Sequence, residues 1–220
     1  MKKVLLIMIM TTLSCSLALA QNLNRPLGFS SNMISVSLSG GAVIHATGKY
    51  DAALELSDLL ETGPTFVGSL TYSASPILSI RGTFDFAYNY FESKYRSEGK
   101  KPSFVMPAIT ADAIFKLGPL IEGNDAGNPY IFAGAGIYFW KFSNDKIDGD
   151  AMSSINGKEW KATSFGLHAG TGFEVYIIPS LAFFAEGQYR FIFSKQTDDF
   201  GNDFENLGFF KFSGGVTYYF

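Results

Sequence analysis

The sequence predicts an all-β fold: a single closed, antiparallel, up-and-down barrel of eight strands that crosses a membrane. Three observations predict this fold. The N-terminus carries a short leader typical of exported proteins, eight later segments alternate between apolar and polar residues with a period of two, and the connections between them alternate between short and long. We expect one barrel domain over residues 21–220 after the leader.

The leader occupies residues 1–20. Two lysines precede a short apolar run, and Ala18-Leu19-Ala20 supplies the small residues of a cleavage site, so we predict a signal peptide that is removed on export. The apolar run is much shorter than the roughly 20 residues of a membrane anchor. A lipoprotein signal ending at Cys15 would need an aliphatic residue three positions earlier, where Thr12 stands. Cleavage would remove the only cysteine, and with it any disulfide.

Each strand segment shows two chemically different faces. In 79–90 (SIRGTFDFAYNY), Ile80, Phe84 and Phe86 alternate with polar residues that include Arg81 and Asp85. The predicted strands are 32–40, 65–74, 79–90, 104–117, 130–142, 164–177, 181–193 and 208–220. The segment 130–142 is apolar or glycine on both faces, which leaves its orientation open.

The connections predict two different ends of the barrel. Those at 75–77 and 178–180 are tight turns, and the connection 118–129 is of middling length. The remaining connections are longer and polar, and they span 41–64, 91–103, 143–163 and 194–206. This layout is typical of outer-membrane barrels. Within the first long connection, the apolar spacing in 50–61 predicts a short amphipathic helix.

Composition decides which face should point outward. Aromatic residues make up 16% of the chain and charged residues only 17%, where about 25% charged is usual. An eight-stranded barrel has little internal room, so an inward aromatic face would overfill it. We therefore predict that the aromatic face meets lipid and that small polar side chains line the lumen. The alternative is an exported, soluble, lipocalin-like binder with the opposite orientation. The predicted interfacial girdle comprises Tyr72, Tyr88, Tyr90, Tyr138, Trp140, Tyr189 and Tyr218.

The inward face carries four basic and four acidic side chains, which predicts a neutral network inside the barrel. Counting from the short-turn end places Arg81 level with Asp112, Glu174 and Glu186, and it places Asp85, Arg190 and Lys211 nearer the long loops. The alternative is that these side chains are solvated fillers of the lumen. The predicted lumenal network comprises Arg81, Asp85, Asp112, Lys116, His168, Glu174, Glu186, Gln188, Arg190 and Lys211.

Two stretches resemble a known family. The end of the chain, FKFSGGVTYYF, resembles the C-terminal signal by which outer-membrane barrels are recognised for assembly, carried here by Phe212, Val216, Tyr218 and Phe220. The segment 165–191 resembles the penultimate hairpin of small OmpA-like and OmpX-like eight-stranded barrels. The resemblance implies an outer-membrane protein of a Gram-negative-type bacterium, surrounded by outer-membrane lipid and lipopolysaccharide and assembled by the barrel-assembly machinery.

The sequence offers no catalytic set. Neither His45, in the first predicted long loop, nor His168 is followed by the x-Ser of barrel deacylases. No spacing suggests zinc, and the acidic loops 145–150 and 198–205 lack the spacing of a calcium-binding loop. A net charge of −3 without a basic stripe argues against a nucleic-acid partner.

We therefore expect a non-enzymatic barrel without cofactor or metal, with a polar network filling most of its lumen. Its role would be structural, or would depend on long extracellular loops that contact a surface ligand or a host component. A narrow passive pore and a lipid-modifying barrel enzyme remain as alternatives, beside the soluble binder.

Overall fold

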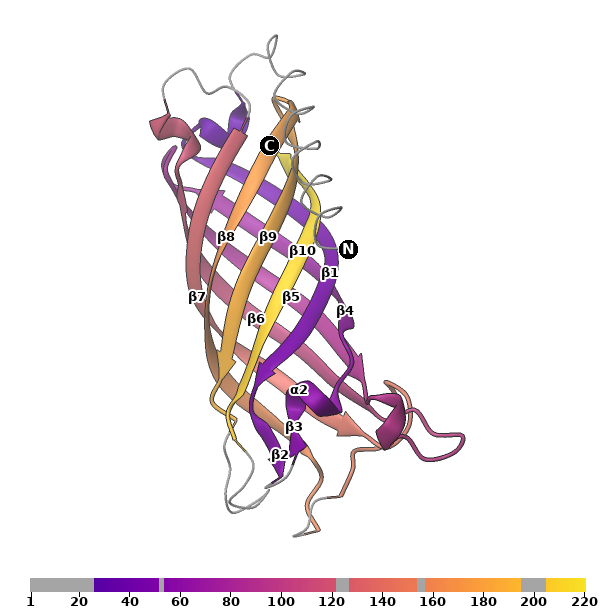
Figure 1. Cartoon of the computed structure of the whole chain (residues 1–220). Coiled ribbons are helices and arrows are strands. Elements are labelled where there is room, and N and C mark those ends of the chain that lie inside the picture. Colours follow the sequence, from indigo (N-terminus) through magenta and orange to yellow (C-terminus); the bar gives the residue numbers. More distant parts are fainter. Residues whose placement is uncertain (1–25, 52–53, 122–126, 154–156, 195–204) are drawn as a thin grey trace.

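A computed structural model describes residues 26–51, 54–121, 127–153, 157–194 and 205–220. Over these residues the chain forms one closed antiparallel barrel of eight strands (Figure 1), which confirms the predicted fold class. Strands that follow one another in the sequence are neighbours in the wall, and the first and last wall strands pair to close it. The wall consists of β1 (Met33–Thr47), β4 (Gly63–Ser73), β5 (Leu78–Tyr90), β6 (Ser103–Lys116), β7 (Gly127–Ser143), β8 (Lys161–Ile178), β9 (Leu181–Ile192) and β10 (Leu207–Tyr219).

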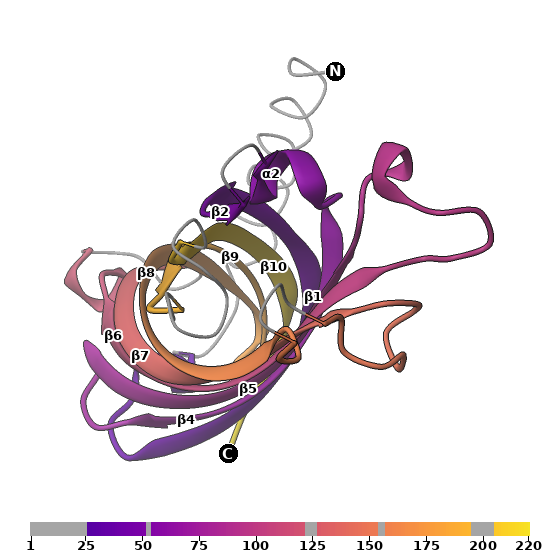
Figure 2. The ribbon, with the colours of Figure 1, turned by 90° about the horizontal axis from the view of Figure 1, so that it is seen from below.

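The two ends of the barrel differ as predicted. Tight connections join β4 to β5 and β8 to β9 at one end, called here the short-turn end, where the last strand also finishes. The long connections lie at the opposite, long-loop end, which is the lower end in Figure 1 and faces the viewer in Figure 2. β1 continues beyond the predicted end at Gly40 as far as Thr47, because its ladder with β10 extends to Gly208. The first long connection is correspondingly shorter than expected.

The small elements lie in the connections and before β1. They are η1 (Leu27–Phe29), β2 (Lys49–Asp51), β3 (Leu54–Glu55), α2 (Leu56–Leu59), η2 (Ser93–Tyr95) and η3 (Gly118–Leu120). The helix predicted within 50–61 is only the four residues of α2, because the residues before it pair as the β2–β3 hairpin instead. In the described part of the chain, no helix combines the length and the apolar character that a membrane crossing by a helix requires.

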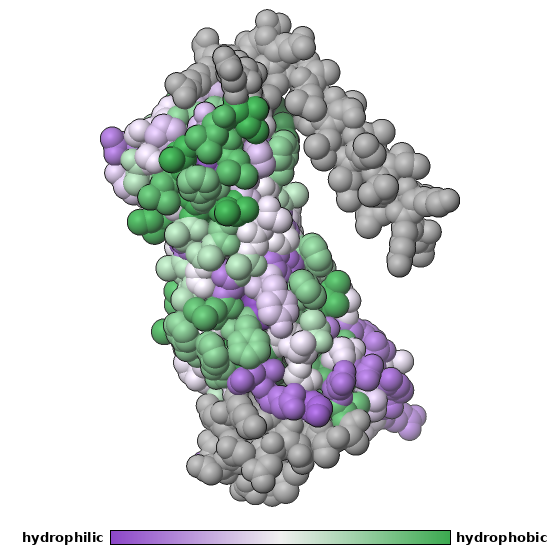
Figure 3. Space-filling view, turned by 60° about the vertical axis from the view of Figure 1, so that its left-hand side comes forward, coloured by the Kyte–Doolittle hydropathy of each residue, from purple (hydrophilic) through white to green (hydrophobic). Residues whose placement is uncertain are grey.

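The barrel has its apolar side chains outside and its charges inside. Phe84 and Ile109, on neighbouring strands, are 57% and 59% exposed, whereas Asp85 is fully buried. Apolar side chains cover much of the wall in Figure 3, and hydrophilic ones gather along its lower margin. This is the outward aromatic face that the sequence predicted, and it is the arrangement that a lipid environment requires.

The structure settles the orientation of β7. Ile131 and Ile137 point outward and are about half exposed, while Tyr130, Tyr138 and Trp140 point inward and are buried. The predicted girdle is therefore wrong at Tyr138 and Trp140. Their polar atoms find partners inside the barrel: the Tyr138 hydroxyl lies 3.3 Å from His168 Nδ1, and Trp140 Nε1 donates to Ser164 Oγ at 3.0 Å.

Candidate functional site

The middle of the lumen is built around Arg81 on β5. Its Nε donates to Asp112 Oδ2 at 2.7 Å, as their level along the strands suggested, and its guanidinium also pairs with Glu186 on β9. His168 Nε2 contacts the other oxygen of Asp112. We call Arg81, Asp112, His168 and Glu186 the middle layer. Gly134 lies between Asp112 and His168, and a Cβ there would lie 2.4 Å from Asp112 Oδ1, so only glycine leaves room for their contact.

Aromatic side chains complete the middle layer. The Arg81 guanidinium lies 4.8 Å from the centre of the Phe132 ring, a distance at which a cation is attracted to a ring face. Tyr130 donates its hydroxyl hydrogen to Glu186 at 2.8 Å. These rings come from inward positions of β7, the strand whose pattern left its orientation open. Sequence reasoning therefore missed both residues as lumenal partners.

A second group lies nearer the long loops. Asp85 Oδ2 is 2.5 Å from both Arg190 Nη2 and Lys211 Nζ, and Thr65 donates to Oδ1 at 2.6 Å. Gln188 accepts a hydrogen bond from Arg190 Nε at 3.0 Å. We call these residues the upper layer, where upper means nearer the long loops; the long-loop end is drawn at the bottom of Figure 1. One carboxylate is shared by two cations, whereas in the middle layer two carboxylates share one guanidinium.

The remaining two predicted charges, Lys116 and Glu174, lie toward the short-turn end and do not pair directly. The expectation that Glu174 lies level with Arg81 is therefore wrong, because Glu174 is held by tyrosines at this end instead. Glu174 accepts hydrogen bonds from Tyr219 at 2.7 Å and Tyr176 at 2.8 Å. Lys116 donates to the Gly28 carbonyl and to Ser73 Oγ, each at 3.0 Å. Hydroxyl and carbonyl groups thus give these two buried charges hydrogen-bond partners. Without such partners, burying a charged group would cost free energy.

The turn η1 enters the short-turn end, which sequence reasoning did not anticipate. Leu27 N donates to the Pro179 carbonyl at 2.9 Å. Phe29 is buried and meets the Tyr176 ring edge-on, with 5.3 Å between ring centres. The only signal in the sequence was a pair of apolar residues just before the first strand. Because Lys116 holds the Gly28 carbonyl, this segment is part of the lumenal arrangement.

The long-loop end of the lumen is apolar, which corrects the expectation of a small polar face along the whole interior. Phe142 packs among several rings there, including Phe104 at 4.8 Å and Trp160 at 5.7 Å between ring centres. Leu56 and Leu59 of α2 are buried against the inward side chains at this end, so these inward positions are shielded from water and take apolar residues. This loop-end cluster comprises Val43, Leu56, Leu59, Leu60, Ala87, Phe91, Phe104, Met106, Ala108, Tyr138, Trp140, Phe142, Trp160, Ile192, Leu207 and Phe209.

His45 belongs to this end of the barrel rather than to a loop. It lies within β1, is buried between Phe104 and Phe209, and its Nε2 is 3.3 Å from Asn89 Oδ1. The expectation that His45 lies in a loop is wrong, because β1 continues beyond the residues that alternate between apolar and polar.

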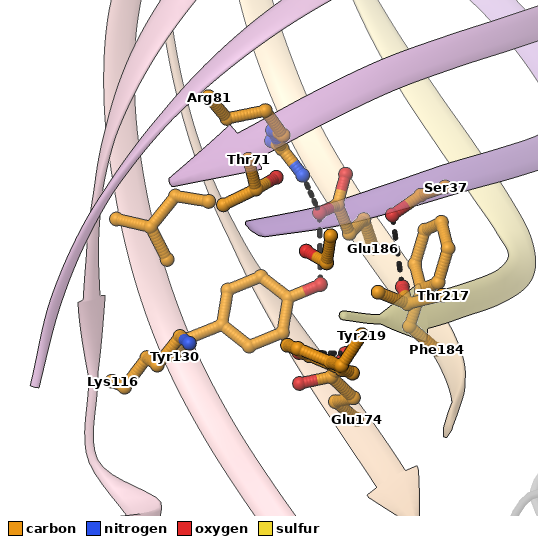
Figure 4. A pocket seen from close by; sticks show the side chains of 12 residues that line it. Ser37, Thr71, Arg81, Lys116, Tyr130, Glu174, Phe184, Glu186, Thr217 and Tyr219 are labelled. Atoms are coloured by element: carbon orange, nitrogen blue, oxygen red, sulfur yellow. Dashed lines mark hydrogen bonds and ion pairs between the residues drawn. The ribbon is translucent and has the colours of Figure 1, made fainter. Parts of the chain in front are cut away.

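Little space remains between the layers. One cavity of about 30 Å³ lies between the middle layer and the short-turn end (Figure 4), and another of about 10 Å³ lies between the middle and upper layers. A single water needs roughly 10–15 Å³ measured in this way. These two cavities therefore have the size of a few waters.

The other features predicted from the sequence do not belong to the lumenal network. The candidate assembly residues Phe212, Val216, Tyr218 and Phe220 all face outward. Within the described ranges no group of three or more acidic, histidine or cysteine side chains could hold a metal ion. The predicted signal peptide and most of the acidic loop 198–205 lie outside the described residues.

The comparisons with known proteins agree with this architecture. No protein-family model matches the chain, and no curated protein matches its sequence. The fold is similar to the crystal structure of Neisserial surface protein A, with a TM-score of 0.54 at 17% identity over 86% of this chain and 97% of that one. It is also similar to the outer membrane protein OprG from Pseudomonas aeruginosa, with a TM-score of 0.53 at 14% identity over 89% and 99% of the two chains.

The closed eight-stranded wall, its outward apolar surface and these similarities define the fold class: this chain has the fold of the small outer-membrane β-barrels.

Proposed function

We propose that this protein is a non-enzymatic outer-membrane barrel that conducts no solute and acts through the surface formed by its long loops. The observation that carries the proposal is the series of buried side chains that occupy the lumen at successive levels. From one end to the other, the interior holds η1, the middle layer, the upper layer and the loop-end cluster. Eight strands enclose only enough room for side chains, and here large side chains occupy it.

The charge pairing supports a closed lumen rather than a lined channel. A channel keeps its charged groups in water, whereas Asp85, Arg190 and Lys211 are each at most 2% exposed. Their short contacts to one another replace the water that they lack. Moving any of them aside would leave a buried charge without its partner, so the network resists opening.

The long loops would supply the interaction surface. The loop between β5 and β6 is basic, and Lys94 and Lys100 are exposed on it. Arg96 anchors this loop, because it pairs with Glu61 at 2.7 Å and donates to the Phe91 carbonyl at 2.7 Å. We propose that loops of this kind contact envelope components such as lipopolysaccharide, or a ligand outside the cell. The outward residues at the end of β10 would engage the assembly machinery before the barrel closes.

An enzymatic role finds no support in the described residues. Tyr138, His168 and Asp112 form a chain of contacts that resembles a nucleophile, a base and an orienting acid. However, the cavity beside them is about 10 Å³, which leaves no room for a substrate. We propose that the chain of contacts is structural.

Single-channel recording tests the proposal. Mature protein refolded into detergent and reconstituted in planar bilayers should give no stable openings, because buried side chains occupy the lumen at each of these levels. A Phe142→Ala, Arg190→Ala double variant removes bulk from two levels of the lumen and serves as the comparison. Large, stable openings of the wild type would contradict the proposal and favour the passive pore. A band shift on boiling in dodecyl sulfate gels would establish a folded, detergent-stable barrel, which a soluble binder would not show.

A further inference from the structure

A groove of about 520 Å³ lies on the outer wall near the long-loop end. It runs across β6, β7 and β8, and its lining includes Val105, Pro107, Phe139, Lys141, Lys161 and Thr163. Its volume lies within the range of ligand pockets, roughly 300–1,000 Å³. It is much larger than either lumenal cavity and is separate from them. We call it the β6–β8 groove.

The groove follows a break in the wall. The ladder between β6 and β7 is interrupted between the pairs Val105–Lys141 and Ala108–Tyr138. Pro107 stands in the interrupted stretch, and a proline has no N–H with which to bond a neighbouring strand. The pairing of β7 with β8 continues at the same level, where Phe139 faces Thr163. The break is therefore local to the pairing of β6 with β7.

Two lysines mark the loop-end margin of the groove. Lys141 and Lys161 are directly opposite one another on adjacent strands. Like charges in directly opposed positions destabilise a sheet. Lys141 Nζ donates to the Gly149 carbonyl at 2.9 Å, and Lys161 Nζ pairs with Glu159. An ammonium group has three donors, so each lysine retains donors for a further partner. Glu159 offsets the charge of Lys161 in part, and an anion between the two ammonium groups would reduce the repulsion that remains.

The other end of the groove continues into the lipid-facing surface. Ile137 on β7 and Phe165 on β8 are paired and about half exposed, and they lie further along the same strands toward the short-turn end. A ligand of the groove would thus meet apolar side chains at one end and ammonium groups at the other. This distribution matches an amphipathic molecule that lies along the wall.

We infer that the β6–β8 groove binds one phosphorylated lipid of the outer leaflet. Its phosphate bridges Lys141 and Lys161, and an acyl chain lies over Pro107 and Phe139. The inference rests on the proposed placement of the long loops outside the cell, which puts this margin at the level of outer-leaflet headgroups. A lipid fits better than free phosphate because most of the lining is apolar and opens onto hydrocarbon.

Native mass spectrometry on the refolded barrel in a zwitterionic detergent tests the inference. The probes are bis-phosphorylated lipid A, the same lipid without phosphates, and inorganic phosphate. The variant Lys141→Gln, Lys161→Gln removes the charges, and Lys49→Gln, Lys146→Gln is its matched control, because both of these lysines are exposed and lie outside the lining of the groove. Thr163→Phe fills the groove, and Ala111→Phe adds the same ring at another outward position. The band shift on boiling verifies that each variant is folded.

The wild type should bind the phosphorylated lipid at least about tenfold more tightly than the dephosphorylated one, since each charge-assisted hydrogen bond contributes roughly 1.5–3 kcal/mol. Lys141→Gln, Lys161→Gln should abolish that preference, Thr163→Phe should weaken both lipids, and the two controls should match the wild type. Equal binding of both lipids, an unchanged lysine variant, or free phosphate binding as tightly as the lipid would overturn the inference. None of these results affects conductance, so the closed lumen is tested separately.

Discussion

Asp85 and Lys211 form an ion pair across the upper layer, with 2.5 Å between Oδ2 and Nζ, and Arg190 shares the same oxygen. Neutralising Asp85 would leave two cations buried together. We expect Asp85→Asn to lower the free energy of unfolding by about 3–5 kcal/mol, the usual cost of breaking a buried pair. Urea titration in detergent, followed by the gel shift, measures the loss. The exposed Asp148→Asn should change little, and equal stability of the two variants would mean that the cations are solvated.

The turn η1 should depend on the absence of a side chain at Gly28. A Cβ at this position would lie 2.0 Å from the Tyr176 hydroxyl, which Glu174 holds in place. We expect Gly28→Ala to displace η1 and expose the Leu27 amide, which hydrogen exchange would detect as faster exchange. Gly82→Ala is the control, because a Cβ there meets nothing within 4 Å. Unchanged protection in Gly28→Ala would show that η1 is not held as described.

The loop-end cluster should lose stability when α2 is trimmed. Leu56 is fully buried, and its removal leaves a cavity beside the aromatic rings. We expect Leu56→Ala to cost about 2–5 kcal/mol. It should also shift tryptophan emission to the red, because both tryptophans of the chain belong to this cluster. The variant Leu120→Ala, at an outward position, should leave the emission unchanged. An unshifted spectrum in Leu56→Ala would show that α2 does not pack against the loop-end cluster.

The outward face should reject charge in a bilayer. Phe84 is 57% exposed in the middle of β5, so the side chain of Phe84→Lys would project into hydrocarbon. We expect a loss of about 2–4 kcal/mol if the residue lies at the bilayer midplane, measured by refolding into lipid vesicles under urea. Ser97→Lys, on the loop between β5 and β6, should refold like the wild type. Equal refolding of both variants would contradict the lipid-facing assignment.

Much of the fold follows from local pattern. Alternation with a period of two indicates which residues share a face of a strand. Ile80 and Phe84 could therefore be assigned outward, and Arg81 and Asp85 inward, without a structure. The pattern fails where both faces are alike, as in β7, and where a strand continues through Gly40 and Gly41 without alternation. In these stretches the pairing with neighbouring strands sets which side chains face inward. The sequence of a single segment carries no information about that pairing.

The sequence by itself determined the positions of the strands, the difference between the two ends and the outward apolar surface, because each depends on residues close together in the chain. Only the tertiary structure decided that Arg190 and Lys211 share Asp85, that η1 enters the short-turn end, and that aromatic rings fill the long-loop end. These contacts join residues far apart in sequence. They depend on strand stagger and on distances across the lumen, which closure of the barrel sets.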